Sequence, residues 1–597
     1  MVPSAPPRST KMVGTMIRCL LGFALALALS AQTPPHVSRA KEIVYAAPDS
    51  LDSSIGLRAH IERYQTDRTA LARYYKVDEA PQRIKAFRTF NNSWLKTLAE
   101  LKFSALPHDA QVDHVLLTNI IKLDLRRVQQ VEERMNEALS LLPFAPEIFE
   151  LIDNRVRVEP PDSPKIAATL FRLEKQIAGL RKEIPSRKGS VKPSTANRAA
   201  RLAREFATAL KEWNTFYNGY DPNFSWWTAE PFAKLGKAME AYADDLREKL
   251  AGVPKTDLDS ILGDPIGDAA LRDELRFEIV PYTPEELVKI AEKEFAWCDR
   301  EMLKASRELG FGDDWKKALE HVKNLYVPPG QQATLVRDQV FEAIDFLEKR
   351  NLVSIPAYTK DIWRMRMMTP AEQRINPFFL GGEQIIVSFP TAEMPHEAKL
   401  MSLRGNNIHF SRATVHHEVI PGHHLQTYMT QRYRPYRRAF FTPFWIEGWA
   451  LYWEMRLWDL GFPQTAENRI GMLFWRMHRC ARILFSLNFH LEKWTAAQCV
   501  DFLVDRVGHE RENAAAEVRR SFEANYSPLY QAAYMLGGLQ FRALHTELVV
   551  SGKMTERAFH DTILQSGSMP VELVRASLLK QALAPAFQSS WRFYGQP

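Results

Sequence analysis

Apolar residues recur at steps of three and four along most of this chain, and this spacing restricts the folds that it can adopt. Between residues 287 and 305, Leu, Ile, Ala, Phe, Cys and Met side chains fall on one face of a helix. Just upstream, Thr283, Pro284 and Glu286 form a typical helix start with a capping box. Similar spacing covers residues 109–141, 195–218, 331–350, 466–491 and 530–550. The sequence therefore predicts a mainly α fold.

A single segment favours a strand. Residues 384–389 are rich in β-branched side chains and are bounded by Gly381, Gly382 and Pro390. Such a strand is either part of the core or an edge that pairs with an extended peptide. We therefore expect a small β element close to the chemical centre described below.

The N-terminus has the pattern of a secretory signal peptide. After Arg18 come eleven apolar residues, 19–29, and then the small residues Ser30 and Ala31. Eleven residues are too few to span a bilayer, and the alternative, a buried amphipathic helix, would need a polar face that this stretch lacks. Cys19 stands at the start of the apolar stretch rather than after it, and so is not where a lipid-modified cysteine would be. We expect residues 1–31 to be removed and the mature protein to be soluble in the periplasm or outside the cell.

Charge and cysteine content exclude several classes of protein. The 78 basic and 71 acidic side chains leave a net charge of +7, which falls to +4 once the three basic residues of the leader are removed. So small an excess, with no dense basic stripe, argues against nucleic-acid binding. No later segment has 18 uninterrupted apolar residues, so stable membrane insertion is not expected. Three cysteines remain after cleavage, too few for a disulfide framework.

Residues 414–426 carry the clearest chemical signal, four histidines and a glutamate within nine residues. A catalytic zinc site takes three such ligands and leaves a fourth position for water. The usual HExxH spacing is missing, because position i+4 from His417 is Pro421. On a straight helix His423 would be rotated by ~240° and displaced by ~9 Å, and His424 would lie ~10.5 Å away. A break at Pro421 would bring His423 back beside His417; otherwise the segment is a polar helix that happens to be rich in histidine.

A glutamate further along strengthens the case for a metal. Glu447 stands in an apolar, aromatic segment, residues 444–454, where a carboxylate is expensive to bury unless it is paired or binds a metal. We therefore expect Glu447 to be the third ligand, and Gly448 to let another helix, or the metal site itself, approach the backbone closely. Glu454 is two helical turns from Glu447, too far to bind the same ion, and is expected to form a salt bridge or to face the cleft.

Two blocks resemble a known family. Residues 417–424 (HEVIPGHH) and 447–452 (EGWALY) are similar to the signature of the bacterial domain-of-unknown-function family 885, whose members belong with zinc peptidases of the gluzincin type. The resemblance extends over nearly all of the mature chain and implies a helical zincin-like metallopeptidase with a deep cleft. The order of these residues is also distantly similar to helical dipeptidyl carboxypeptidases related to angiotensin-converting enzyme, with two residues inserted before Gly422. That alignment favours His423 over His424 as the second ligand.

Together, the motifs and the resemblance predict a Zn²⁺ site with a general base. Glu418 would take a proton from water and later deliver it to the leaving amine. His416 and His424 would orient ligands or meet substrate. The expected metal ligands are His417, His423 and Glu447.

Other candidates follow these motifs in the chain. Tyr526 and Tyr534 stand in a segment that resembles the tyrosine-rich segment of such peptidases, where a phenol donates to the developing oxyanion; otherwise they are core or rim residues. Tyr530 departs from the Pro-Gly-Gln of the family and is expected to alter the pocket. His490 either binds a substrate carbonyl or is structural among its phenylalanine neighbours. A peptide C-terminal carboxylate could bind Arg482, Arg519 or Arg520.

The function expected from these residues is that of a secreted zinc metallopeptidase acting on short peptides in a restricted cleft. An amidase or ester hydrolase acting on cell-wall or other non-peptide substrates would need the same ligands and base. A non-catalytic peptide-binding protein on this scaffold is disfavoured by the presence of Glu418. We expect residues 32–280 to form an N-terminal helical part and residues 281–597 the catalytic part of one continuous unit, because loops such as residues 187–195 are too short to be domain linkers.

Overall fold

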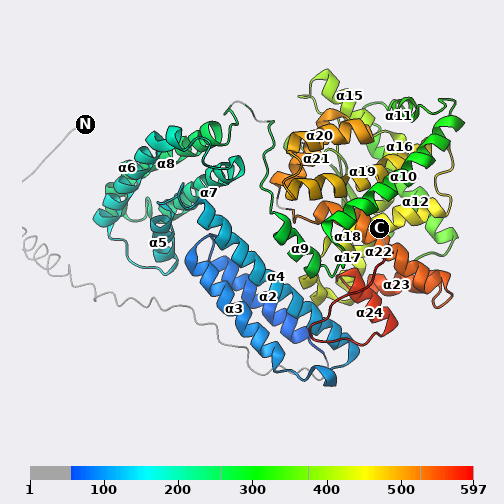
Figure 1. The fold of residues 1–597 in the computed structure, drawn as a ribbon, viewed down its shortest axis with the longest axis horizontal. Helices are drawn as coiled ribbons and strands as arrows, with labels where there is room; N and C mark the ends of the chain where they lie inside the picture. The colour runs from blue at the N-terminus through cyan, green and yellow to red at the C-terminus, as the bar shows by residue number, and fades with distance from the viewer. Residues whose placement is uncertain (1–55, 256, 258, 374, 525, 596–597) are drawn as a thin grey trace, which may run out of the picture.

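The computed structural model describes residues 56–595 except 256, 258, 374 and 525, so the expected leader, residues 1–31, lies outside the described part (Figure 1). Its N-terminal helices are α2 (Arg58–Tyr74), α3 (Pro81–Ala99), α4 (His108–Ala138), α5 (Ala145–Val156), α6 (Ser163–Arg187), α7 (Pro193–Tyr217) and α8 (Pro222–Asp245). They are followed by α9 (Asp268–Phe277), α10 (Pro284–Glu308), α11 (Trp315–Lys323), α12 (Gln332–Lys349), α13 (Ala357–Ile362), α14 (Pro370–Gln373), α15 (His396–Gly405), α16 (Ile408–Glu418) and α17 (His423–Tyr433). The last are α18 (Pro443–Asp459), α19 (Ala466–His490), α20 (Ala496–Phe502), α21 (Arg511–Glu523), α22 (Tyr530–His545), α23 (Glu556–Ser566) and α24 (Val571–Leu579).

The mainly α fold and the helices expected from apolar spacing are confirmed. The five spaced segments correspond to α4, α7, α12, α19 and α22, the last continued by a π-helical turn, Thr546–Val550. At the start of α10, the Thr283 hydroxyl accepts from the Glu286 N–H (3.2 Å) and the Glu286 carboxylate accepts from the Thr283 N–H (2.8 Å), so the capping box is also confirmed. None of the described helices is both long and apolar enough to cross a membrane.

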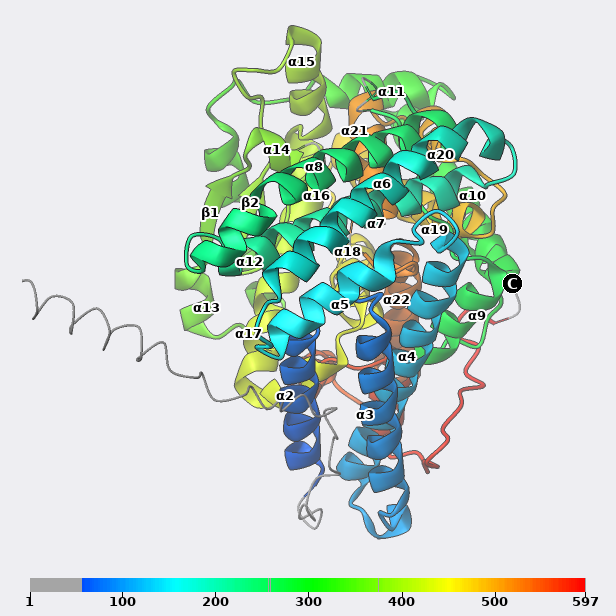
Figure 2. The same ribbon diagram turned by 90° about the vertical axis from the view of Figure 1, so that its left-hand side faces the viewer.

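Apolar packing divides the molecule into two main cores. One joins α5–α8 to the end of α4. The other joins α2, α3 and the first half of α4 to the helices from α9 onward, and it extends from Ile61 to Phe593. Figures 1 and 2 show α5–α8 as a group of helices beside the rest of the molecule. Along the chain, the larger core gives way to the smaller core within α4, and it resumes between Ala251 and Leu271.

The small β element consists of β1 (Arg364–Met367) and β2 (Gln384–Val387), which pair in parallel. The strand expected over residues 384–389 therefore ends at Val387. On the other edge of β2, Ile386 exchanges both backbone hydrogen bonds with Leu380 (N···O 2.8 and 3.0 Å). Because the chain folds back on β2 at this point, Ile386 is not open to an extended peptide, and the edge role considered for this strand is wrong there.

Three helices position the chemical centre. α19 is buried along nearly its whole length. α18 crosses α22 where Gly448 meets Gly537, and a Cβ atom added to Gly448 would lie 2.6 Å from the Gly537 Cα. The expectation that Gly448 admits another helix is thus confirmed. This close crossing brings the first turn of α22 against Glu447 on α18.

Candidate metal centre

The histidine motif is folded around a break between two helices. α16 ends at Glu418, α17 begins at His423, and residues 419–422 leave the helical path. A Cβ atom at Gly422 would lie 1.7 Å from the His417 carbonyl oxygen, so only glycine fits there. The break expected from the Pro-Gly pair is therefore confirmed.

The break brings two histidine rings to Glu447. Its Oε2 lies 3.4 Å from His417 Nε2 and 3.2 Å from His423 Nε2. The two rings stand nearly perpendicular, with centroids 4.8 Å apart. Glu447 Oε2 is buried and has no hydrogen-bond partner among the described residues. Three consecutive helices, α16, α17 and α18, thus direct one potential ligand atom each toward the same point.

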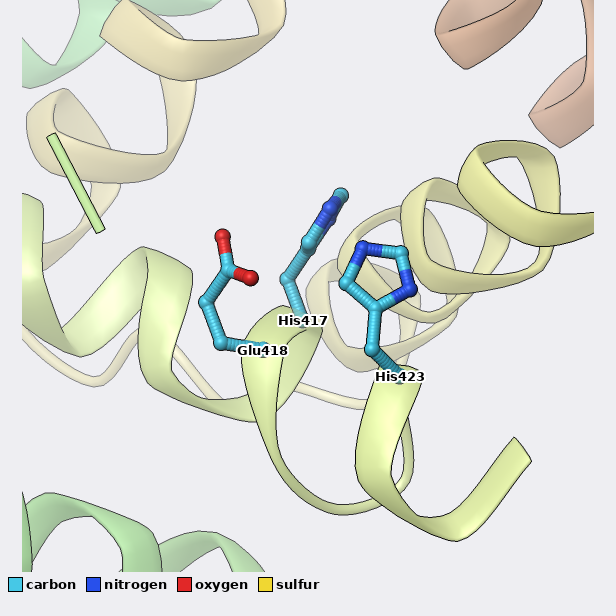
Figure 3. A group of neighbouring side chains, drawn as sticks. All are labelled: His417, Glu418 and His423. Atoms are coloured by element: carbon cyan, nitrogen blue, oxygen red, sulfur yellow. The ribbon is translucent and has the colours of Figure 1, made fainter. Parts of the chain in front are cut away.

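The two separations from Glu447 Oε2 match those between ligands of tetrahedral zinc. Ligand atoms ~2.0–2.1 Å from a tetrahedral ion lie about 3.3 Å from one another, and the two measured separations from Glu447 Oε2 are 3.2 and 3.4 Å. Glu418 also comes near, since ligand atoms of His417, Glu418 and His423 all lie within 4.8 Å of one another (Figure 3). Glu447 Oε2, which lies within 3.4 Å of both ring nitrogens, has the geometry of the third ligand.

His417 is held from behind by Glu454, which lies further along α18. Glu454 Oε1 accepts from His417 Nδ1 (2.7 Å) and from Arg479 Nη2 (3.1 Å), so the expected salt bridge is confirmed. Because Nδ1 is occupied, Nε2 is the ring atom left to face Glu447. Burial raises the pKa of Glu454, but Arg479 and His417 outweigh burial and lower the pKa to about 2. Glu454 therefore stays ionised.

The same contacts set the protonation of His417 when no ion is bound. Burial lowers the pKa of the ring, yet its close contacts with the carboxylates of Glu447 and Glu454 outweigh burial and raise the pKa to about 9. Metal ligands must be deprotonated, so an ion would have to displace this proton.

Tyr530 holds the second oxygen of Glu447. Its hydroxyl donates to Glu447 Oε1. Burial, followed by the charge of Glu447, raises the pKa of Tyr530 well above its ordinary value, so the phenol remains a donor. Since Oε1 is occupied in this way, Oε2 is the oxygen that turns to the histidines.

Glu418 is confined between the histidines and a loop. Gly382 N–H donates to the Glu418 carbonyl oxygen (3.1 Å), and a Cβ atom at Gly381 would lie 2.3 Å from Glu418 Oε2. Burial raises the pKa of the Glu418 carboxyl, although His417 and His423 oppose this. The result is a carboxyl with increased proton affinity beside the two rings.

His417, Glu418, His423 and Glu447 line one cavity of about 460 Å³. Tyr526, Tyr530 and Tyr534 line it too, and the Tyr534 ring stacks on His417 with centroids 6.0 Å apart and an interplanar angle of 13°. Three arginines complete the polar part of the lining: Arg479, Arg482 and Arg520.

Comparison with known proteins places this fold in a family. Residues 68–578 match the family described as bacterial protein of unknown function (DUF885). The chain belongs to this family. No curated protein matches the DUF885 chain.

Two solved structures are similar to this DUF885 protein in fold. One, described as "a putative lipoprotein of unknown function from Shewanella oneidensis", is 17% identical, with a TM-score of 0.65 over 87% of this chain and 99% of that chain. The other, "the putative lipoprotein from Colwellia psychrerythraea", is 16% identical, with a TM-score of 0.55 over 88% of this chain and 97% of that chain. At these identities the likeness shows a shared fold.

The DUF885 chain does not bring His490 into the cavity, contrary to expectation. His490 ends α19, eleven residues and ~16 Å along the helix axis from Arg479. Its ring packs on Phe489 and Phe522, with centroids 5.3 and 6.0 Å away. Burial lowers its pKa to about 4. Of the two roles considered for His490, its surroundings therefore fit the structural one.

Two other histidines also turn away from the ligands. His424 Nε2 lies 2.9 Å from the Thr359 carbonyl oxygen, and His416 Nδ1 lies 3.2 Å from the Arg412 carbonyl oxygen. Neither lines the cavity. The geometry thus favours His423 over His424 as the second ligand, and the orienting role expected of His416 and His424 is not seen.

Sequence reasoning missed two contacts of this site. Glu454 was expected in an ion pair but not as the partner of His417, although its i+7 spacing from Glu447 puts both carboxylates on one face of α18. The sequence distinguishes Tyr530 only as a departure from the family pattern. Its bond to Glu447 depends on the crossing of α18 and α22, which sequence spacing does not reveal.

Proposed function

We propose that this DUF885 protein is an exported, zincin-like zinc metallopeptidase that hydrolyses short peptides. The observation that carries the proposal is the approach of His417 Nε2 and His423 Nε2 to the unpartnered Oε2 of Glu447. Two imidazoles and one carboxylate leave a tetrahedral ion with one open position, the arrangement of catalytic rather than structural zinc sites.

The residues around this centre have complementary roles in hydrolysis. Bound by these ligands, Zn²⁺ would lower the pKa of a water molecule to about 7 and polarise a carbonyl group. Glu418 accepts a proton from the attacking water and later delivers it to the leaving amine, and its raised pKa suits a group that must carry the proton between these steps.

Two phenols supply hydrogen-bond donors on the cavity wall. Tyr526 and Tyr534 line the cavity, and burial raises the pKa of Tyr534, which keeps its hydroxyl protonated. A phenol in this position donates to the carbonyl oxygen as negative charge develops on it.

Substrate size and location follow from the cavity and the leader. A volume of about 460 Å³ is within the ~300–1,000 Å³ of sites that take small ligands, which favours short peptides over folded proteins. The signal-peptide pattern of residues 1–31 supports a periplasmic or extracellular location.

Two variants of the zinc-loaded, mature protein test the proposal together. Glu418→Gln should keep about one zinc ion per chain but lose ~10²–10⁴-fold in kcat, because it removes the base and not a ligand. Glu447→Ala should lose both zinc and activity. Zinc content is measured by mass spectrometry and hydrolysis with a library of short peptides.

Each variant serves as the control of the other. Full activity in a zinc-loaded Glu418→Gln protein would contradict the role of the base. A parent protein that holds zinc but cleaves only non-peptide amides or esters would show that the substrate class is wrong, while leaving the ligand assignment intact.

A further inference from the structure

The cavity contains more positive charge than the metal centre requires. Arg479 and Arg482 from α19 and Arg520 from α21 line it, with 4%, 2% and 6% of their surfaces exposed. Buried guanidinium groups are rare unless a carboxylate balances each one. Their partners therefore decide whether a charge is left over for substrate.

Only two of the three arginines are matched by carboxylates. Arg479 bonds to Glu454, which is already shared with His417. Arg482 Nε donates to Glu517 Oε1 at 2.7 Å, whereas Arg520 Nη1 is 4.0 Å from Glu517 Oε2. One buried carboxylate thus faces two guanidinium groups, which leaves a surplus of one positive charge.

The histidines behind this pair do not change that balance. His478 and His509 lie 2.8 Å apart, N to N, on the side of Glu517. Burial lowers the pKa of both rings, that of His509 to about 3. The rings are therefore neutral near pH 7, and the surplus charge belongs to Arg482 and Arg520.

Both guanidinium groups also have unused donors. Arg482 Nη1 and Arg520 Nε are buried and find no hydrogen-bond partner among the described residues. A buried donor without a partner destabilises the protein by ~1–3 kcal/mol, and by more when it is charged. An anion with two oxygens would satisfy donors and charge together, because the guanidinium fork matches a carboxylate.

This surplus lies close to the metal centre. The guanidinium carbon of Arg482 is 4.2 Å from the centroid of the Tyr534 ring, which in turn lies 6.0 Å from the His417 ring. Arg482 is therefore within about 10 Å of the His417 ring, a span that three residues of extended chain cover at ~3.3–3.6 Å each. A group bound there sits within a few residues of the bond to be broken.

We propose that Arg482 and Arg520 bind a carboxylate of the substrate within about three residues of the scissile bond. The substrates are then short peptides with a free C-terminal carboxylate, or with an acidic side chain, at that place. This inference rests on the proposed function for its substrate class, but the binding of the anion does not depend on hydrolysis.

The test measures binding to the zinc-loaded Glu418→Gln protein, which does not turn substrate over. Four tetrapeptides of equal length are titrated by calorimetry: with a free C-terminal carboxylate or a C-terminal amide, and with a glutamate or a glutamine as the third residue. Loss of the recognised carboxylate should weaken binding by ~10- to 100-fold. The pair of peptides that shows the loss identifies the source of the carboxylate.

Two added substitutions make the assignment specific. Arg520→Gln should remove most of the difference in affinity between peptides with and without the recognised carboxylate. Because Glu517 keeps its partner Arg482 in this variant, the fold is less disturbed. Arg519→Gln is the matched control, because Arg519 is on the same helix but bonds to the Asp259 carbonyl oxygen (3.0 Å) and does not line the cavity. Arg520→Lys keeps the positive charge but not the two-pronged guanidinium group. The loss of affinity caused by removing the carboxylate should therefore be intermediate in this variant, between that in Arg520→Gln and that in Arg519→Gln.

Equal affinity for all four peptides would overturn the inference, and so would an equal loss in the Arg519→Gln control. If the parent protein hydrolyses carboxylate and amide peptides with the same kcat/KM, the peptidase proposal stands and the arginine subsite is wrong. If nothing is hydrolysed but the carboxylate peptides bind more tightly, the subsite stands and the peptidase proposal is wrong.

Discussion

Replacing Glu454 tests whether the centre depends on the residue that holds His417. Glu454 Oε1 accepts from two donors, His417 Nδ1 at 2.7 Å and Arg479 Nη2 at 3.1 Å. In Glu454→Gln the uncharged amide oxygen can still accept a hydrogen bond from one of these donors. In Glu454→Ala neither donor keeps an acceptor at this position. Loss of such a partner weakens metal binding by ~10- to 100-fold, and we expect Gln near the lower and Ala near the upper end.

These factors correspond to ~1.4 and ~2.7 kcal/mol of zinc-binding free energy. Glu454→Ala should also lower the free energy of unfolding by ~3–5 kcal/mol, because Arg479 is left buried without a carboxylate. Zinc affinity is measured by competition with a chromophoric chelator, and unfolding in denaturant without metal. The two measurements separate the effect on the ion from the effect on the fold.

Glu556→Ala is the matched control. Glu556 accepts from Arg456 of the same helix α18, with an Nη2···Oε2 distance of 2.8 Å, but it does not line the cavity. Its loss should destabilise the protein and leave zinc affinity unchanged. A Glu454→Ala protein that binds zinc within twofold of the parent would refute the reasoning, because orientation of His417 would then be immaterial.

Two further outcomes are expected. Gly448→Ala should destabilise the protein by ~1–3 kcal/mol in thermal unfolding, because its Cβ would lie 2.6 Å from the Gly537 Cα. The control is Gly236→Ala on α8, where nothing lies within 4 Å of the added atom. This control substitution should be neutral or stabilising. Mass spectrometry of the exported protein should find a new N-terminus near Ala31, and an intact leader on cytoplasmic protein would contradict the expected location.

Much of the fold was predictable because its helices are amphipathic and long. The spacing in α10 and its capping box depend on neighbours within a few residues, which a sequence displays directly. The break before His423 was predictable for the same reason, since Pro421 and Gly422 act on the local backbone. The division into two cores was not predictable, because α4 contributes to both and nothing in its apolar spacing marks where one core ends and the other begins.

The candidate site shows the same division between local and long-range information. His417, Glu418 and His423 are close in sequence, so the motif itself presents them as candidates, and the family resemblance favours His423 over His424. His490 was misplaced because a histidine in an apolar helix looks the same whether its face meets a cavity or the packed core. Arg520 could not be chosen over Arg519 from sequence, since which neighbour faces inward depends on how α21 lies against α19.

The larger core also bears on the order in which the protein is made. It contains both Ile61 and Phe593, and His108 reaches the Gln581 carbonyl oxygen at 2.9 Å. A ribosome adds residues in sequence, so this core cannot close until translation is nearly complete, whereas the α5–α8 core needs nothing beyond Leu262. The nascent chain therefore stays incompletely folded until its last helices have been synthesised, and the candidate metal centre, built from residues 417–534, is assembled only in that final stage.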